Sequence, residues 1–109
     1  MIPDGTRIAD ARLEAYSLPF RRPWQTRHGA VEARRGWLLH LVDDLGRRAV
    51  GEAAPWPDAG TESAADCGDA LADVCRWLPG VTPAAALERL PTAAAGPAAR
   101  CGVEGALYG

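Results

Sequence analysis

The stretch WLLHLVDDLGRRAVGEA, residues 37–53, decides the fold. In residues 37–42 both faces of an extended chain are largely apolar, with His40 as the exception. Such strands are covered on both faces, so we expect this one to be central in a sheet and covered twice. Residues 43–46 are typical of a hairpin turn, because Gly46 can adopt a positive φ. Residues 47–53 then predict an antiparallel partner strand.

A further strand is predicted before this hairpin, over residues 7–18. Apolar and charged residues alternate there with a period of two, through Ala11, Arg12, Leu13, Glu14 and Ala15. Pro19 and Pro23 interrupt the pattern. We interpret residues 21–35, RRPWQTRHGAVEARR, as a loop that is too long for a hairpin turn. It could be a lid over a ligand, a partner-binding loop or a disordered insertion.

After the third strand the period changes from two to that of a helix. Residues 54–63 form a Pro/Gly loop. Apolar residues then recur at spacings of 3, 4, 3 and 4, which places them on one helical face: Ala64, Cys67, Leu71, Val74 and Leu78. Ser63 and Asp66 have the spacing of a capping box, Thr61 is a rival N-cap, and residues 79–80 end the helix.

Two shorter helices are predicted downstream. Thr82 and Pro83 are an N-cap and a first-turn proline, Leu87 and Leu90 supply apolar contacts, and Pro91 ends the helix. Residues 97–109 are a third helical candidate, although each of its internal glycines costs about 1 kcal/mol relative to Ala. The predicted fold class is therefore α+β: a three-stranded antiparallel meander followed by two to three helices.

Length and charge narrow the classes of partner. A chain of 109 residues with 48% apolar and 24% charged residues is typical of one soluble globular domain. No apolar run approaches the about 20 residues that span a bilayer, and the N-terminus lacks a secretory pattern, so we expect a cytoplasmic protein. The net charge of −2 favours neither nucleic acid nor membrane as a partner. The arginine pairs at 21–22, 34–35 and 47–48 are interpreted as solvated strand ends.

The reactive side chains offer little chemistry. All twelve basic residues are Arg, which excludes a lysine Schiff base or a lysine general base from this chain. The three cysteines match no zinc pattern and are expected to be reduced, small, buried helix residues: Cys67, Cys75 and Cys101. His40 is expected to be a satisfied sheet residue, and His28 has no nucleophile nearby in sequence.

Acidic residues do not form a metal-binding pattern either. Asp66, Asp69 and Asp73 share one predicted helix face, which is typical of a solvated surface. We therefore predict no catalytic residue and no metal ligand in this chain.

Three segments together resemble a known family. They are LPFRRPWQTRHG (residues 18–29), RRGWLLHLVDDLGRRAVGEAAPWPDAGTES (residues 34–63) and PAARCGVEGAL (residues 97–107). Their order and spacing resemble the amino-terminal domain of the enolase superfamily, of the mandelate racemase/muconate lactonizing enzyme type. Within that superfamily the likeness is closest to o-succinylbenzoate synthases.

The resemblance implies a capping domain. In that family a meander and a helical bundle cap a modified (β/α) barrel, and two loops close over the barrel mouth. These loops correspond here to residues 21–35 and 52–60. The resemblance also implies that residues 1–96 are the capping domain. Residues 97–109 would then begin the helix that leads into a barrel absent from this chain.

The resemblance places the family's chemistry in the barrel. Barrel lysines move the proton, and Mg²⁺ on three barrel carboxylates holds the enediolate, because a carbon acid beside a carboxylate is very weak. The implied function is capping and specificity in an enzyme of menaquinone synthesis that dehydrates a cyclohexadiene carboxylate. This chain would hold no cofactor, its partner would be the barrel, and Mg²⁺ would belong to the full-length enzyme.

Other functions remain open from the sequence. The parent enzyme could be a muconate-type cycloisomerase, an N-acylamino acid racemase or a dipeptide epimerase. The chain could also be a free-standing protein-interaction module that binds through the surface a barrel would cover, with self-association through that face.

The two loops supply the expected substrate contacts. Trp24 and Trp56 would be apolar walls, next to Pro55, and Gly29 would be a hinge. The expected polar contacts are Gln25, Thr26, Arg27 and His28. Glu52 is expected to be a structural carboxylate that caps nearby backbone N–H groups.

Overall fold

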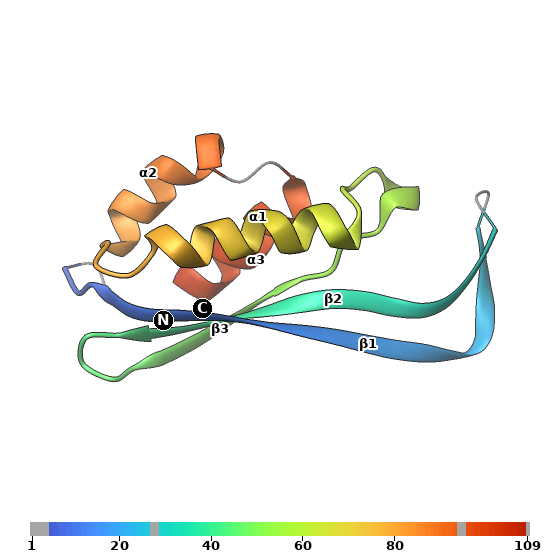
Figure 1. Cartoon of the computed structure of the whole chain (residues 1–109), viewed down its shortest axis with the longest axis horizontal. Helices are drawn as coiled ribbons and strands as arrows, with labels where there is room; N and C mark the ends of the chain where they lie inside the picture. The colour runs from blue at the N-terminus through green and yellow to red at the C-terminus, as the bar shows by residue number, and fades with distance from the viewer. Residues whose placement is uncertain (1–4, 27–28, 94–95, 109) are drawn as a thin grey trace.

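The computed structural model describes residues 5–26, 29–93 and 96–108. The chain folds into a three-stranded sheet followed by three helices, which confirms the predicted α+β class (Figure 1). The elements are β1 (Ile8–Thr26), β2 (Gly29–Asp43), β3 (Arg48–Ala53), a 3₁₀ turn η1 (Pro57–Ala59), α1 (Ala64–Trp77), α2 (Pro83–Ala93) and α3 (Pro97–Tyr108).

The sheet is an antiparallel meander in the order β1-β2-β3, and the helices lie on one of its faces (Figure 1). Leu39 and Leu41 point to that face and are buried in the core. The opposite face of β2 is only half-buried, and none of the three described helices covers it. The prediction that the central strand is covered twice is therefore wrong. Charged side chains on β1 and β3 flank its apolar residues there instead, as Glu14 and Glu52 flank Leu38.

Residues 21–35 are not the predicted loop. β1 and β2 continue through them as a long hairpin, in which Trp24 pairs with Val31 and Thr26 with Gly29 (Figure 1). β1 lies at the edge of the sheet, where a missing N–H is tolerated, and the register shifts between Pro19 and Trp24. Arg27 and His28 lie outside the described residues.

The turn between β2 and β3 is confirmed. Gly46 has a φ of 82°. The carboxylate of Asp43, which is 1% exposed, accepts hydrogen bonds from the N–H groups of Leu45 (3.0 Å) and Arg47 (2.8 Å) and pairs with the Arg47 guanidinium (2.7 Å). Burial alone would raise the pKa of Asp43, but these hydrogen bonds outweigh it and hold the pKa below its ordinary value.

The helices begin largely where predicted. The Ser63 hydroxyl accepts the Asp66 N–H at 3.1 Å, so Ser63, and not Thr61, is the N-cap of α1. α2 extends to Ala93, so the prediction that Pro91 ends it is wrong. The helix continues for two residues past this proline, whose missing N–H costs it one hydrogen bond.

α3 packs against β3 and contributes Ala99, Val103 and Ala106 to the core. Gly51 and Gly102 let the two backbones approach, since a Cβ on either glycine would collide with the other element. The division of the chain at residue 97 stays a prediction.

The three cysteines are free and lie in helices, but their burial differs. Cys67 is buried and Cys75 is half-buried, whereas Cys101 is exposed, so the prediction of a buried residue is wrong for Cys101. Burial, and secondarily the charge of Glu62, raises the pKa of the Cys67 thiol to about 12.

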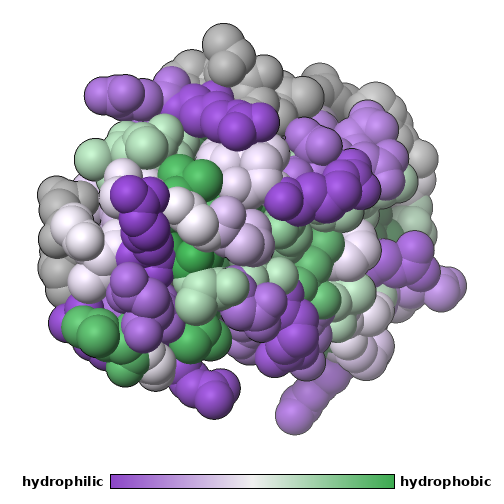
Figure 2. Space-filling view, turned by 60° about the vertical axis from the view of Figure 1, so that its left-hand side comes forward, coloured by the Kyte–Doolittle hydropathy of each residue, from purple (hydrophilic) through white to green (hydrophobic). Residues whose placement is uncertain are grey.

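The outer surface mixes residue types. Figure 2 shows apolar and hydrophilic residues interspersed on one face of the molecule. Of the paired arginines, Arg34 is half-buried and the others that the structure describes are exposed. Among the helices of the described ranges, none is long and apolar enough to cross a bilayer.

Candidate functional site

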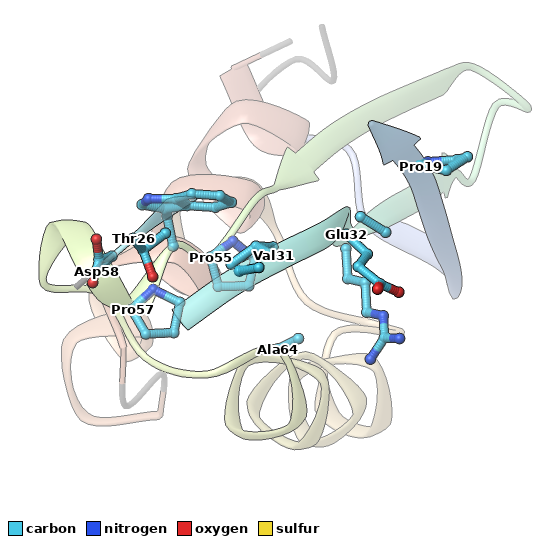
Figure 3. A pocket seen from close by; sticks show the side chains of 12 residues that line it. Pro19, Thr26, Val31, Glu32, Pro55, Pro57, Asp58 and Ala64 are labelled. Carbon is cyan, nitrogen blue, oxygen red and sulfur yellow. The ribbon is translucent and has the colours of Figure 1, made fainter. Parts of the chain in front are cut away.

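A cleft of about 700 Å³ lies between the β1–β2 hairpin and the loop of residues 54–63. The hairpin contributes Thr26, Val31, Glu32 and Arg35 to its lining, and the loop contributes Pro55, Trp56, Pro57 and Asp58 (Figure 3). Ala64, at the start of α1, completes one side. The fold thus brings together the two segments that the sequence singled out, although one of them is a hairpin.

The predicted site residues divide into three groups. Thr26, Pro55 and Trp56 line the cleft. Trp24 and Gln25 are exposed on the hairpin and are not among the described lining residues, and Gly29 lies at the hairpin tip with a φ of 116°. Arg27 and His28, as noted, are outside the described residues. Whether any of these residues contacts a substrate stays a prediction.

Trp56 is held by two side chains that no sequence pattern indicated. The Arg34 guanidinium lies 4.6 Å from the Trp56 ring centroid, and its Nη2 donates to the Ala54 carbonyl at 2.9 Å. The Phe20 ring meets Trp56 edge-on at 6.5 Å and also contacts Trp24, with 6.3 Å between centroids. Trp24 therefore reaches the cleft wall through Phe20.

The loop of residues 54–63 is closed by its own hydrogen bonds. Thr61 Oγ1 accepts the Trp56 N–H at 2.5 Å, and the Ala59 N–H donates to the Trp56 carbonyl at 2.8 Å. Thr61 therefore organises the loop, which explains why it does not cap α1. Both the N–H and the carbonyl of Trp56 are therefore held by hydrogen bonds within the loop.

Glu62 connects this loop to a distant helix. Its Oε1 accepts the Ala98 N–H at 3.0 Å and its Oε2 accepts the Ala99 N–H at 2.9 Å, both in the first turn of α3. A carboxylate is favoured at this end of a helix. The partner lies 36 residues away in the chain, so no local sequence signal could have revealed the contact.

Glu52 does not have the role predicted for it. Its Oε2 accepts the Tyr16 hydroxyl at 2.5 Å, so it binds a side chain and not backbone N–H groups. Tyr16 lies over Gly36, where a Cβ would collide with its ring. Burial first, and then the hydrogen bond to Glu52, raises the pKa of Tyr16 to about 12.

The lining of the cleft is mostly apolar and carries few charged side chains. Its described charged residues are Glu32, Arg35 and Asp58, set among proline, alanine and tryptophan side chains. Within the described residues, no three His, Cys, Asp or Glu side chains come together in a way that could hold a metal ion. The predicted solvated face of α1 is confirmed, because Asp66, Asp69 and Asp73 are all exposed.

The other histidine is satisfied within the sheet. His40 Nε2 lies 2.8 Å from Glu14 Oε1 across the β1–β2 ladder, which confirms the prediction made for it. It lies on the face opposite the helices and takes no part in the cleft.

Comparison with known proteins gives one family match. The model of the MenC N-terminal domain matches residues 8–102. No curated protein matches the chain.

Solved structures share the fold over 94% of this chain. A mandelate racemase/muconate lactonizing protein from Herpetosiphon aurantiacus is 29% identical with a TM-score of 0.76. A 2-chloromuconate cycloisomerase from Rhodococcus opacus and the L-Ala-D/L-Glu epimerase from Bacillus subtilis are each 23% identical, with TM-scores of 0.80 and 0.77. The chain spans 30% of the length of each of these proteins.

Proposed function

The chain belongs to the MenC N-terminal domain family, and from this we propose that it is the capping and specificity domain of a larger, o-succinylbenzoate-synthase-like enzyme. One observation carries the proposal: the hairpin and the 54–63 loop, far apart in sequence, together form an apolar cleft of about 700 Å³. This chain spans 30% of the length of the solved structure from Herpetosiphon aurantiacus. In the parent enzyme a barrel would make up most of the remaining length.

The cleft explains how such a domain acts. Trp56 and Pro55 supply a rigid apolar wall, and Thr26 supplies a hydroxyl beside it. Closed over a barrel mouth, these side chains exclude water and select the shape of the substrate. Trp24, Gln25, Arg27 and His28 are proposed as further contacts from the hairpin, with Gly29 as its hinge.

The bond-making chemistry is assigned to the barrel. The chain contains no Lys, and the described residues offer no cluster for a metal, so the proposal gives this chain no catalytic step. Mg²⁺ would be held by barrel carboxylates and would stabilise the negative charge that develops when a proton leaves carbon. We place the complete enzyme in the cytoplasm.

The test uses the full-length gene product with Mg²⁺. We expect it to dehydrate the cyclohexadiene carboxylate of menaquinone synthesis, whereas the 109-residue chain alone shows no turnover. Trp56→Ala in the full-length enzyme should raise KM with little change in kcat, because it removes substrate binding and leaves the barrel intact. Turnover by the isolated chain would contradict the assignment of catalysis to the barrel.

A second candidate has its own support. The solved structures of this fold include an epimerase and a cycloisomerase, so a dipeptide or a muconate is the second candidate substrate of the parent enzyme, beside the N-acylamino acid that the sequence left open. The full-length protein is therefore assayed with each of these substrates in parallel. Preference for one of them, with no activity on the cyclohexadiene carboxylate, would replace the first proposal.

A free-standing module is the remaining alternative, and it is decided by the gene. A stop codon directly after codon 109 would favour it, whereas a downstream barrel sequence would exclude it. If the chain acts alone, the surface that a barrel would cover should promote self-association. A monomer at all concentrations in sedimentation analysis would count against that role.

A further inference from the structure

We propose that Glu62 is a positioning residue of the cleft, which ties the loop bearing Trp56 to the first turn of α3. Its effect on substrate rests on the proposed function, whereas its effect on the geometry of the loop does not. Glu62 joins two parts of the chain and takes no part in the chemistry.

The contact itself is strong. Both carboxylate oxygens are used, at 3.0 Å to the Ala98 N–H and 2.9 Å to the Ala99 N–H. Each is a charge-assisted hydrogen bond, and the acceptor lies at the positive end of the α3 dipole. Glu62 is half-buried, so solvent competes only partly for these oxygens.

The packing beside it leaves little room for another arrangement. Gly96 precedes α3 and is buried, and a Cβ there would collide with the carboxylate of Glu62. The chain at the start of α3 therefore lies directly against the Glu62 side chain. The fold therefore fixes both the position of the Glu62 carboxylate and the space that the carboxylate occupies.

Two consecutive residues then transmit the position of α3 to the cleft: Thr61 holds the Trp56 N–H, and Glu62 holds α3. The next residue, Ser63, caps α1 and lies outside this path. Thr61 Oγ1 also donates to the Glu62 carbonyl at 3.2 Å. A short chain of hydrogen bonds thus links Trp56 to α3. Loss of the Glu62 contact should therefore free the loop of residues 54–63.

The first experiment measures catalysis in the full-length enzyme. Glu62→Ala should raise KM about tenfold with kcat nearly unchanged, because the wall that contacts the substrate is no longer held in place. Glu62→Gln keeps one acceptor oxygen and should fall between the wild type and Glu62→Ala.

Ser63→Ala is the matched control. It removes the adjacent helix cap and lowers the melting temperature, but it leaves the Glu62 contact intact. Its KM should stay within about twofold of the wild type. Equal KM values for the two alanine variants would show that Glu62 only stabilises the fold, and would overturn the proposal.

The second experiment needs no activity. In the full-length protein labelled with ¹⁵N at Ala and Trp, Glu62→Ala should shift the amide signals of Ala98 and Ala99 together with that of Trp56, whereas Ser63→Ala should not shift them. A Trp56 signal that stays in place while the alanine signals move would overturn the proposal. If the enzyme lacks activity on every substrate tested, the proposed function fails, and the spectra still decide the role of Glu62.

Discussion

The two halves of the β1–β2 ladder differ in what covers them. Where β2 pairs with both neighbours, Leu39 and Leu41 lie under the helices and are at most 1% exposed. In the projecting hairpin the same two strands stay paired on both sides of the irregularity between Pro19 and Trp24, yet Leu18 is 60% and Trp24 is 59% exposed. Backbone pairing is thus common to both halves, and side-chain burial is not. We infer that the covered half supplies stability and that the hairpin is free to serve the cleft.

The largest expected effect tests the covered half. Leu41→Ala leaves a cavity in the core and should lower the free energy of unfolding by about 2–5 kcal/mol, measured by urea denaturation. Leu18→Ala is the matched control in the hairpin and should change that free energy by less than about 0.5 kcal/mol. Similar losses for the two variants would mean that the hairpin belongs to the core after all.

The contact between α3 and β3 provides the next test. A Cβ on Gly102 would lie 2.9 Å from Ala53 Cβ, so Gly102→Ala should cost about 1–3 kcal/mol of unfolding free energy. Gly105 is exposed in the same helix, and a Cβ there meets only Gly51 Cα at 3.9 Å. Gly105→Ala should therefore stabilise the protein by up to about 1 kcal/mol. Melting temperatures that move in the same direction for both variants would contradict this close packing.

The same contrast explains which parts of the fold could be predicted from sequence. The covered half has periodic patterns, because each buried face selects apolar residues: the spacing through Cys67, Leu71 and Val74 predicted α1, and residues 47–53 predicted β3 almost to its bounds. The hairpin has no buried face to impose a pattern. Its prolines indicated a loop, although an edge strand tolerates them.

The site was predictable only in outline. The sequence singled out both segments that form the cleft, and Pro55, Trp56 and Thr26 do line it. The residues that hold the wall were missed, because the Arg34–Trp56 stack and the contact of Glu62 with α3 join residues about 20 or more positions apart. In the sequence Arg34 has the pattern of a solvated charge, because its contact with Trp56 depends on the register of the folded chain.

The uncovered face of the sheet gives a smaller, pH-dependent effect. The pKa of Tyr16 is raised to about 12, so the folded state favours the protonated phenol. The stabilisation from this group is complete below its unfolded pKa of about 10 and is lost as the pH rises toward 12. Tyr16→Phe should cost about 1 kcal/mol near neutral pH and should remove this alkaline loss, as measured by urea unfolding across that range. An unchanged alkaline loss in the variant would assign it to another group.

The smallest expected effect on stability concerns Trp24, and it separates stability from function in the hairpin. Trp24 is 59% exposed and its ring lies against Phe20, so Trp24→Ala should change the free energy of unfolding by less than about 0.5 kcal/mol. If the hairpin serves the substrate, the same variant should raise KM in the full-length enzyme, because Phe20 also braces Trp56. Leu18→Ala, equally exposed on the hairpin but absent from this aromatic contact, should leave KM unchanged. A KM that changes in neither variant would confine the specificity role to the 54–63 loop, whereas a change in Trp24→Ala alone would show that an exposed side chain acts on the cleft through its neighbour.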